Sequence, residues 1–182
     1  MNIVLFGPPG VGKGTQAKKL SQWLRIPHIS IGEILREQIK LDTDLGKQIK
    51  QINDGHLASD ELVSEVVKER LSYSDIKNGF ILDGYPRNLI QAEQFVEIQE
   101  LLNIEIDHWI CLSAPVSKLK ERLVKRAKIE KRADDAEDKI NTRFEVFNNE
   151  TVPCIDSLKD KMKLVSSLKI DETFICLTEI CN

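Results

Sequence analysis

The sequence has no apolar run close to the about 18 residues that a membrane-spanning helix needs, so we do not expect a membrane protein. Its four cysteines include no C-x-x-C pair and no histidine at metal-binding spacing, so we expect ordinary thiols and no metal held by protein ligands. Internal repeats and low-complexity tracts are also absent. The formal net charge of −3 gives no overall attraction to nucleic acid or to an anionic membrane. These absences favour a cytoplasmic globular protein.

The apolar residues come in short runs separated by helical patterns. Five such runs are predicted as strands, at Asn2–Phe6, 27–29, Phe80–Asp83, His108–Ser113 and 163–166. A chain of 182 residues is long enough for one full domain with a small inserted part. Strands that alternate with helices predict an α/β fold with a doubly wound, five-stranded parallel sheet, whose ligands bind at the carboxyl ends of the strands.

Helices are predicted between these strands. The first, Lys13–Leu24, has an apolar face that includes Trp23, and Ser30 is expected to cap the next helix, over 31–39. Helical pieces continue to about residue 71, with an interruption expected at Gly46. The remaining expectations are a second interruption at 53–55, a cap at Ser59 or Asp60, and helices over 88–101, 115–127, 134–158 with a kink at Pro153, and 171–180.

Segment 7–15, which reads Gly-Pro-Pro-Gly-Val-Gly-Lys-Gly-Thr, directly follows the first predicted strand and precedes the first helix. Tight glycine turns point backbone N–H groups at phosphate oxygens, the helix N-terminus adds its positive dipole end, and Lys13 supplies an ammonium group. The segment therefore predicts a phosphate-binding loop (P-loop). The strict pattern has Ser or Thr directly after the lysine as a Mg²⁺ ligand, but Gly14 stands there and Thr15 follows. We therefore expect nucleotide oxygens and water to hold most of the Mg²⁺ coordination.

Charged residues later in the chain suit the same ligand. Asp83 ends a buried strand, where it is placed either to orient water around Mg²⁺ or to cap the following turn, and Arg87 after that turn is a bidentate phosphate donor. Basic residues are densest over 118–143, where Arg122 and Arg126 share one helix face. The sequence offers no Ser/His/Asp or Cys/His arrangement for nucleophilic catalysis. Phosphoryl transfer, which depends on positioning and charge neutralisation, is the predicted reaction class.

These motifs resemble those of adenylate kinases and related nucleoside monophosphate kinases along nearly the whole chain. The segments that carry the resemblance are 7–16, 30–36, 83–87, 121–126 and 132–135, together with Arg143. The resemblance implies a three-layer P-loop kinase fold with a helical monophosphate-binding insert at about 30–59 and a lid at about 126–136. The lid is of the short form, since only a short loop joins Arg126 to Arg132. The implied activity is reversible phosphoryl transfer from ATP to AMP, giving two ADP, by a monomer.

The resemblance also implies a role for each matching residue. Catalytic roles fall to Lys13, Arg87, Arg122, Arg126, Arg132 and Arg143. The expected ATP site comprises Gly10, Val11, Gly12, Lys13, Gly14, Thr15, Arg122, Arg126 and Lys169. The expected AMP site comprises Ile31, Arg36, His56, Leu57, Ala58, Gly84, Tyr85, Pro86, Arg87, Gln91, Arg132 and Arg143. Mg²⁺ is the expected cofactor, with Asp83 orienting its water, and neither nucleic acid nor a membrane is an expected partner. The three histidines are expected at loops or strand edges.

The acceptor nucleotide is the most open part of this interpretation. Gln91 stands four residues after Arg87, where the family carries its adenine marker, and a side-chain amide can donate to one purine atom and accept from another. Ile31 and Ala58 depart from the family pattern at positions that resemble the lining of the acceptor base. A UMP/CMP-type kinase is one alternative, opposed by Gln91. A P-loop module that only binds or senses nucleotide is another, opposed by the retained arginines.

Overall fold

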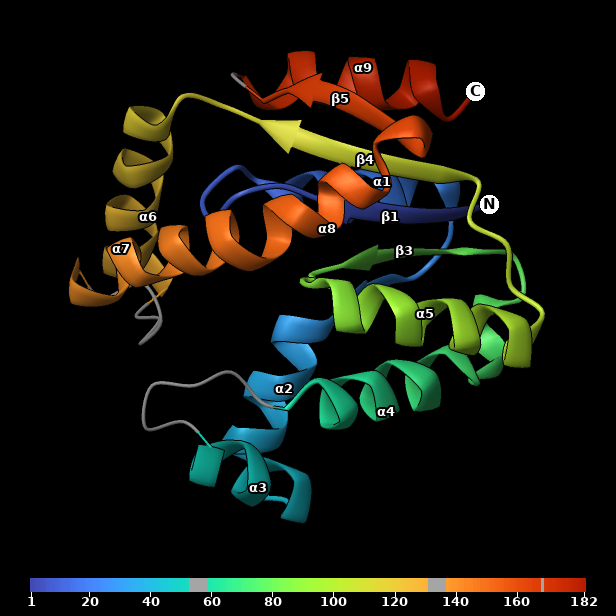
Figure 1. Cartoon of the computed structure of the whole chain (residues 1–182). Helices are drawn as coiled ribbons and strands as arrows, with labels where there is room; N and C mark the ends of the chain where they lie inside the picture. The colour runs from blue at the N-terminus through green and yellow to red at the C-terminus, as the bar shows by residue number, and fades with distance from the viewer. Residues whose placement is uncertain (53–58, 131–136, 168) are drawn as a thin grey trace.

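Five parallel strands form one sheet at the centre of the computed structural model, which describes residues 1–52, 59–130, 137–167 and 169–182 (Figure 1). The strands lie in the order β2-β3-β1-β4-β5. Their bounds are β1 (Asn2–Phe6), β2 (His28–Ser30), β3 (Phe80–Asp83), β4 (His108–Ser113) and β5 (Met162–Ser166). Leu5 of β1 is in register with Asp83 on one side and Ile110 on the other. The predicted sheet is confirmed, and it brings the ends of β1 and β3 to the same edge.

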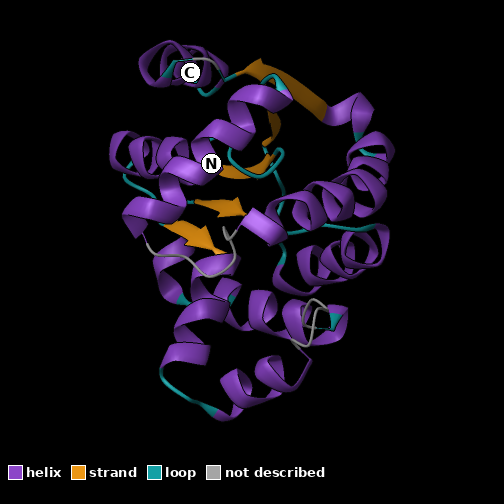
Figure 2. Ribbon diagram, turned by 90° about the vertical axis from the view of Figure 1, so that its left-hand side faces the viewer, coloured by secondary structure: helices purple, strands orange, loops and turns teal. Residues whose placement is uncertain are grey.

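Helices cover both faces of this sheet, as the side view in Figure 2 shows. Their bounds are α1 (Lys13–Leu24), α2 (Ile31–Lys40), α3 (Asp44–Ile52), α4 (Asp60–Leu71), α5 (Leu89–Leu102), α6 (Val116–Glu130), α7 (Glu137–Val146), α8 (Val152–Ser157) and α9 (Ile170–Ile180). Short helical turns lie at η1 (Ser74–Ile76), η3 (Phe147–Thr151) and η4 (Lys159–Lys161). Helices α2 and α3 lie at the end of the molecule away from β5, and in Figure 1 α2 lies beside α4 and α3 below it.

The core is divided by the sheet because successive strand residues point to opposite faces. Val4 and Phe6 of β1 belong to one buried apolar cluster, which includes residues of α4, α5 and α8. Ile3 and Leu5 belong to a second cluster, with residues of α1, α6 and α9. Figure 1 shows α5 and α8 in front of the sheet. The apolar layers on both faces make the sheet a rigid base for the loops at its carboxyl edge.

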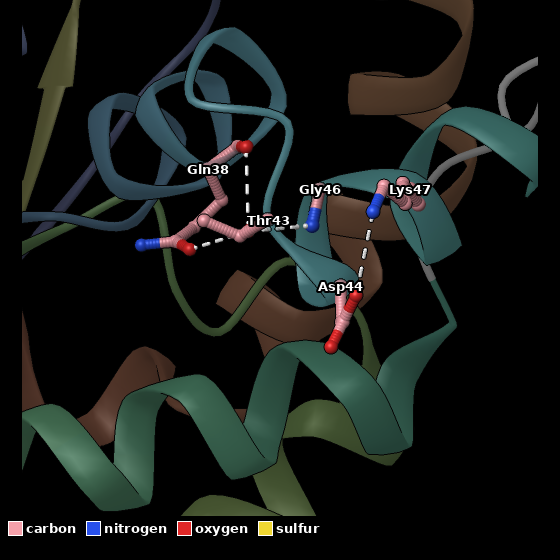
Figure 3. Close-up of polar contacts among 5 residues, drawn as sticks. All are labelled: Gln38, Thr43, Asp44, Gly46 and Lys47. Atoms are coloured by element: carbon pink, nitrogen blue, oxygen red, sulfur yellow. Dashed lines mark hydrogen bonds and ion pairs between the residues drawn. The ribbon is translucent and has the colours of Figure 1, made fainter.

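The predicted interruption at Gly46 is wrong, because Gly46 lies inside α3. The turn comes earlier, where the Thr43 hydroxyl donates to Gln38 Oε1 over 2.7 Å and accepts from the Gly46 backbone N–H over 3.0 Å (Figure 3). A Cβ on Gly46 would lie only 2.1 Å from the Gln38 carbonyl oxygen. Glycine is needed here for the close approach of α3 to α2. An ion pair between Lys47 and Asp44, 3.5 Å apart, adds to the first turn of α3 (Figure 3).

One other helix prediction needs correction. Trp23 is 42% exposed, because it lies at the margin of the stripe through Ala17 and Leu20 that faces the core. The helix expected over 134–158, with a kink at Pro153, continues in the described part without a break through α7, a π-helical stretch at Phe147–Thr151, and α8. The wider turns precede Pro153, since proline has no N–H to donate and its ring crowds the preceding turn. The second expected interruption, at 53–55, lies outside the described residues.

The remaining local expectations agree with the structure. The Ser30 hydroxyl accepts from the Glu33 N–H and caps α2, which ends one residue later than expected. Ser59, one of two expected caps, accepts from the Leu62 N–H at the start of α4. Helix α5 begins after its cap Asn88 and α6 extends to residue 130. These caps satisfy N–H groups that have no partner within the helix.

The P-loop backbone provides a test of this packing. Gly10 has a φ of +80°, and a Cβ there would lie 2.7 Å from the Leu119 carbonyl oxygen, whereas a Cβ on Gly14 would meet Asp83 Oδ2 at 3.8 Å and nothing closer. Gly10→Ala should lower the free energy of unfolding by about 2 kcal/mol through strain and overlap. Gly14→Ala, inside α1, should leave it unchanged or raise it by up to about 1 kcal/mol. Urea denaturation of the two variants checks this, and equal destabilisation would contradict it.

Candidate functional site

The P-loop joins β1 to α1, as the sequence predicts, and places Lys13 at the first position of that helix. Lys13 Nζ donates to the carbonyl oxygens of Gly7 and Pro8, at 2.6 and 3.3 Å. The ammonium group is therefore held by the loop that it closes. The ammonium group can exchange these carbonyl oxygens for the oxygens of a polyphosphate. Such a ligand can therefore bind to Lys13 with little movement of the backbone.

Several positive charges act on one another at this edge of the sheet. Burial lowers the pKa of Lys13 to about 8, the Asp83 charge opposes that shift, and the charges of Arg87 and Arg143 add to it. The structure thus brings together three cations that the sequence assigned to the reaction, from α1, the turn after β3, and α7. Burial alone would raise the pKa of the Asp83 carboxyl, but His28 and the charges of Lys13 and Arg87 hold that pKa below its usual value.

His28 is a neighbour of the site that the sequence analysis missed. His28 lies in β2, which is an edge strand of the sheet, and the sequence predicted such a position for it. Its side chain is nevertheless only 8% exposed. His28 Nε2 lies 3.5 Å from Asp83 Oδ2, at the outer limit of a hydrogen bond, and makes no shorter polar contact. A histidine two residues before the Ser30 cap gives no local signal of this contact. The ring lies beside the carboxylate whose charge acts on Lys13.

One further guanidinium group, that of Arg36, meets Arg87 beside the start of α2. A Cβ on Gly32 would lie 3.2 Å from Arg36 Nη1 and 3.6 Å from Arg87 Nη2, so both groups lie close to one point beside the start of α2. Arg87 Nε also donates to the Gly84 carbonyl oxygen over 2.9 Å, which fixes the arginine against its own turn. Adjacent guanidinium groups favour an anion with several oxygens, such as a phosphate.

Arg122 connects the P-loop to the segment after β5. Its guanidinium donates to the carbonyl oxygens of Val11 and Ser167, at 3.3 and 3.0 Å. The Ser167 hydroxyl donates to the same Val11 carbonyl over 2.7 Å. Lys169, two residues further on, is exposed and pairs with Glu172 over 2.6 Å. Arg122 and Ser167 therefore join the P-loop to the segment that precedes α9 through hydrogen bonds to one P-loop carbonyl.

Gln91 is engaged within the protein. It is 4% exposed, its Oε1 accepts from the Arg87 backbone N–H over 2.8 Å, and its Nε2 donates to Asp60 Oδ1 over 2.7 Å. Tyr85, which is fully buried, donates to the Gln91 carbonyl oxygen over 3.0 Å. The sequence singled out Gln91 by its spacing from Arg87, but gave no sign of its contact with Asp60.

The other expected site residues divide into three groups. Ile31 is 1% exposed and belongs to the apolar cluster that also holds Tyr85, so it serves the core. Thr15 is exposed in α1, and Arg126 is half-buried in α6. The residues that lie outside the described part of the chain are His56, Leu57, Ala58 and Arg132, with most of the predicted lid.

The donor groups fit a Mg²⁺ ion that is bound mainly through the nucleotide. Within the described ranges, no three His, Cys, Asp or Glu residues come together as a metal-binding group. The P-loop region offers the Asp83 carboxylate, whose Oδ2 would lie 3.8 Å from a Cβ on Gly14. One carboxylate suits an ion that keeps several waters and takes its other ligands from phosphates. Separately, none of the described helices has the length and apolar character to cross a membrane.

A five-stranded parallel sheet with a P-loop after β1, a carboxylate at the end of β3 and converging arginines defines a P-loop phosphotransferase. The adenylate kinase family matches residues 5–163. The chain is 44% identical over 176 residues to the adenylate kinase of Mycolicibacterium paratuberculosis, which covers 96% of this chain and 95% of that one. It is 42% identical over 165 residues to that of Cyanothece sp., covering 90% and 85%. The chain belongs to the adenylate kinase family.

The pKa of Lys13 leads to a prediction for ATP binding. In the free protein the ammonium titrates near pH 8, and phosphate oxygens in a complex raise its pKa. Affinity should therefore be full below about pH 8 and fall by up to about tenfold per pH unit above it, because binding must then take up a proton. Calorimetric titration with ATP between about pH 7 and about pH 9.5, in buffers of different ionisation enthalpy, measures both effects.

Lys13→Arg is the control for that titration, since a guanidinium stays charged over the whole range. Its affinity for ATP should be nearly independent of pH above about pH 7, where the terminal phosphate is already mostly ionised. A wild-type affinity that stays constant up to about pH 9.5, with no proton uptake, would contradict the assignment of the titrating group to Lys13.

Proposed function

We propose that this chain catalyses the reversible transfer of a phosphoryl group from ATP to AMP, which gives two ADP. The observation that carries the proposal is the convergence of Lys13, Arg87 and Arg143 beside Asp83, with Arg36 meeting Arg87 at the insert. Membership of the adenylate kinase family supports it. A protein that only binds nucleotide has no need of a second cluster of cations on the acceptor side.

The reaction needs no protein nucleophile. An oxygen of the AMP phosphate, already anionic, attacks the terminal phosphorus of ATP, and the bond from that phosphorus to the bridging oxygen breaks, leaving ADP on both sides. Lys13 releases the carbonyls of Gly7 and Pro8 and binds the donor phosphates. Arg36 and Arg87 hold the acceptor phosphate, while Arg143 stabilises the migrating charge. Positioned cations of this kind act through electrostatic stabilisation of the transition state.

Further assignments follow the family pattern. Mg²⁺, when bound with ATP, neutralises phosphate charge, and Asp83 is the carboxylate that would orient its water. Segment 30–59 is assigned to AMP binding and 126–136 to the lid, with α2 and α3 supplying the described part of the insert. Arg122, Arg126 and Lys169 are assigned to the ATP side, and Arg132 to both nucleotides. The monomeric state and the cytoplasmic location stay predictions.

The test of the proposal is formation of ADP from ATP and AMP with Mg²⁺, with UMP, CMP and GMP as competing acceptors. AMP should have the highest kcat/KM, and ATP hydrolysis without an acceptor should be slow. Preference for UMP or CMP would replace the proposal with the pyrimidine alternative. Binding of ATP with no transfer to any acceptor would leave only a nucleotide-binding module.

The acceptor side can be separated from the donor side with Arg36. Arg36→Ala should raise the KM for AMP by about tenfold or more and change the KM for ATP little, because its guanidinium meets Arg87 beside Gly32, on the proposed acceptor side. Lys40→Ala removes a positive charge from the exposed end of the same helix and should change neither constant. Steady-state kinetics with each substrate varied in turn gives the comparison. Equal effects of Arg36→Ala on both KM values would place this arginine elsewhere.

A further inference from the structure

Asp60, the first residue of α4, binds two side chains of the neighbouring helix at its start. Its Oδ1 accepts from Gln91 Nε2 over 2.7 Å and from Asn88 Nδ2 over 2.9 Å, and its Oδ2 accepts from Asn88 Nδ2 over 3.0 Å. Asn88 in turn caps α5, because its Oδ1 accepts from the Gln91 backbone N–H over 2.8 Å. The carboxylate is thus tied to the residue that the acceptor site is expected to use.

These contacts fix the orientation of the Gln91 amide. A carboxylate only accepts hydrogen bonds, and a backbone N–H only donates. Nε2 must therefore face Asp60, and Oε1 must face the Arg87 N–H, at 2.7 and 2.8 Å. Rotation of the amide by half a turn would place donor against donor and acceptor against acceptor. The two ends of the amide are not interchangeable in this environment.

The carboxylate itself is held by the packing of α4 on α5. Four residues along α4 from Asp60, the Ser64 hydroxyl contacts Tyr85 Oη at 2.8 Å and also donates to Gln94 Oε1 of α5. The Tyr85 ring packs edge-on against Phe95 of α5, with 5.5 Å between ring centroids. These contacts fix α4, whose first residue is Asp60, against α5, and Asn88 holds both oxygens of the carboxylate.

The Gln91 amide keeps one donor and one acceptor that the protein does not use, and their order is fixed. An amide nitrogen carries two hydrogens and an amide oxygen two lone pairs, and the protein uses one of each. What is left is one donor and one acceptor in a fixed arrangement. On the edge formed by N1 and the C6 substituent, a 6-aminopurine presents an acceptor at N1 and a donor at its amino group. A 6-oxopurine presents a donor at N1 and an acceptor at its oxygen, which is the same pair reversed. A freely rotating amide would fit both, whereas a fixed amide fits one.

We propose that Asp60 is a positioning residue that fixes the polarity of the Gln91 amide, so that the acceptor site distinguishes 6-aminopurine from 6-oxopurine monophosphates. The inference rests on the proposed function and on the assignment of Gln91 to the acceptor base. The site distinguishes the two bases by a difference in affinity, because the 6-oxopurine loses hydrogen bonds to the fixed amide that the 6-aminopurine keeps. Asp60 itself need not touch the nucleotide.

The test measures kcat/KM for AMP and for IMP, the matching 6-oxopurine monophosphate, in Asp60→Asn. Asparagine keeps the volume but can pair with either end of the amide, leaving only the Arg87 N–H to oppose rotation. The AMP:IMP ratio should fall by at least about tenfold, with the KM for ATP unchanged. Asp60→Glu keeps a carboxylate, which only accepts hydrogen bonds, and should therefore keep most of the wild-type AMP:IMP ratio. Asp60→Ala gives a second reading if Asp60→Asn does not fold.

Matched variants separate the possible outcomes. Asp75→Asn removes a carboxylate that pairs with Arg70 at the other end of α4, and it should leave the ratio unchanged. A purely structural role for Asp60 would lower the activity with both acceptors equally, and an unchanged ratio in Asp60→Asn overturns the proposal. Gln91→Leu with an unchanged ratio shows that Gln91 does not read the base, which also overturns it. Wild-type protein with no AMP activity would instead overturn the proposed function.

Discussion

Burial of the Lys13 ammonium among other charged groups is the constraint on which the rest of the site depends. Burial does most to lower the pKa of Lys13, the Asp83 charge opposes that shift, and the charges of Arg87 and Arg143 add to it. A fold that only needed stability would separate these charges. Here the parallel sheet, the turn after β3 and α7 hold them together, so that a ligand with several negative charges relieves the repulsion when it binds. Electrostatic strain in the free protein thereby contributes to affinity for phosphates and for the transition state.

The backbone of the P-loop keeps its shape because neighbouring elements hold it from two sides. A Cβ on Gly7 would lie 2.5 Å from the Leu112 carbonyl oxygen of β4, so the loop packs directly on the sheet. On the other side, Arg122 and the Ser167 hydroxyl both donate to the Val11 carbonyl oxygen. The Val11 carbonyl oxygen is therefore held from outside the loop, while Lys13 holds the Gly7 and Pro8 carbonyl oxygens from within it. Preorganisation of this kind lowers the cost of ordering the site on binding.

Sequence reasoning succeeded where the determining interactions are local. The strands β1, β3 and β4 were predicted to the residue, because each is an apolar run bounded by turn residues, and the Ser30 cap follows from adjacent side chains. It failed at Gly46, where the reason for glycine is the approach of another helix. It missed the contact between His28 and Asp83 for the same reason, since those residues meet only when β2 pairs with β3. Gln91 was found by its spacing, but the polarity of its amide depends on Asp60, far away in the sequence.

Ile31 shows how a departure from the family pattern can be explained by packing. Ile31 departs from the family pattern at a position that resembles the lining of the acceptor base. The side chain is 1% exposed and lies in the same apolar cluster as Tyr85, Val63 and Val67. Burial of an isoleucine at the first position of α2 anchors the insert to the sheet, at about 2 kcal/mol for such a side chain. In the proposed function, recognition of the base falls to polar groups that the core holds in place, above all the amide of Gln91, whose two ends are set by hydrogen bonds to Asp60 and to the Arg87 N–H.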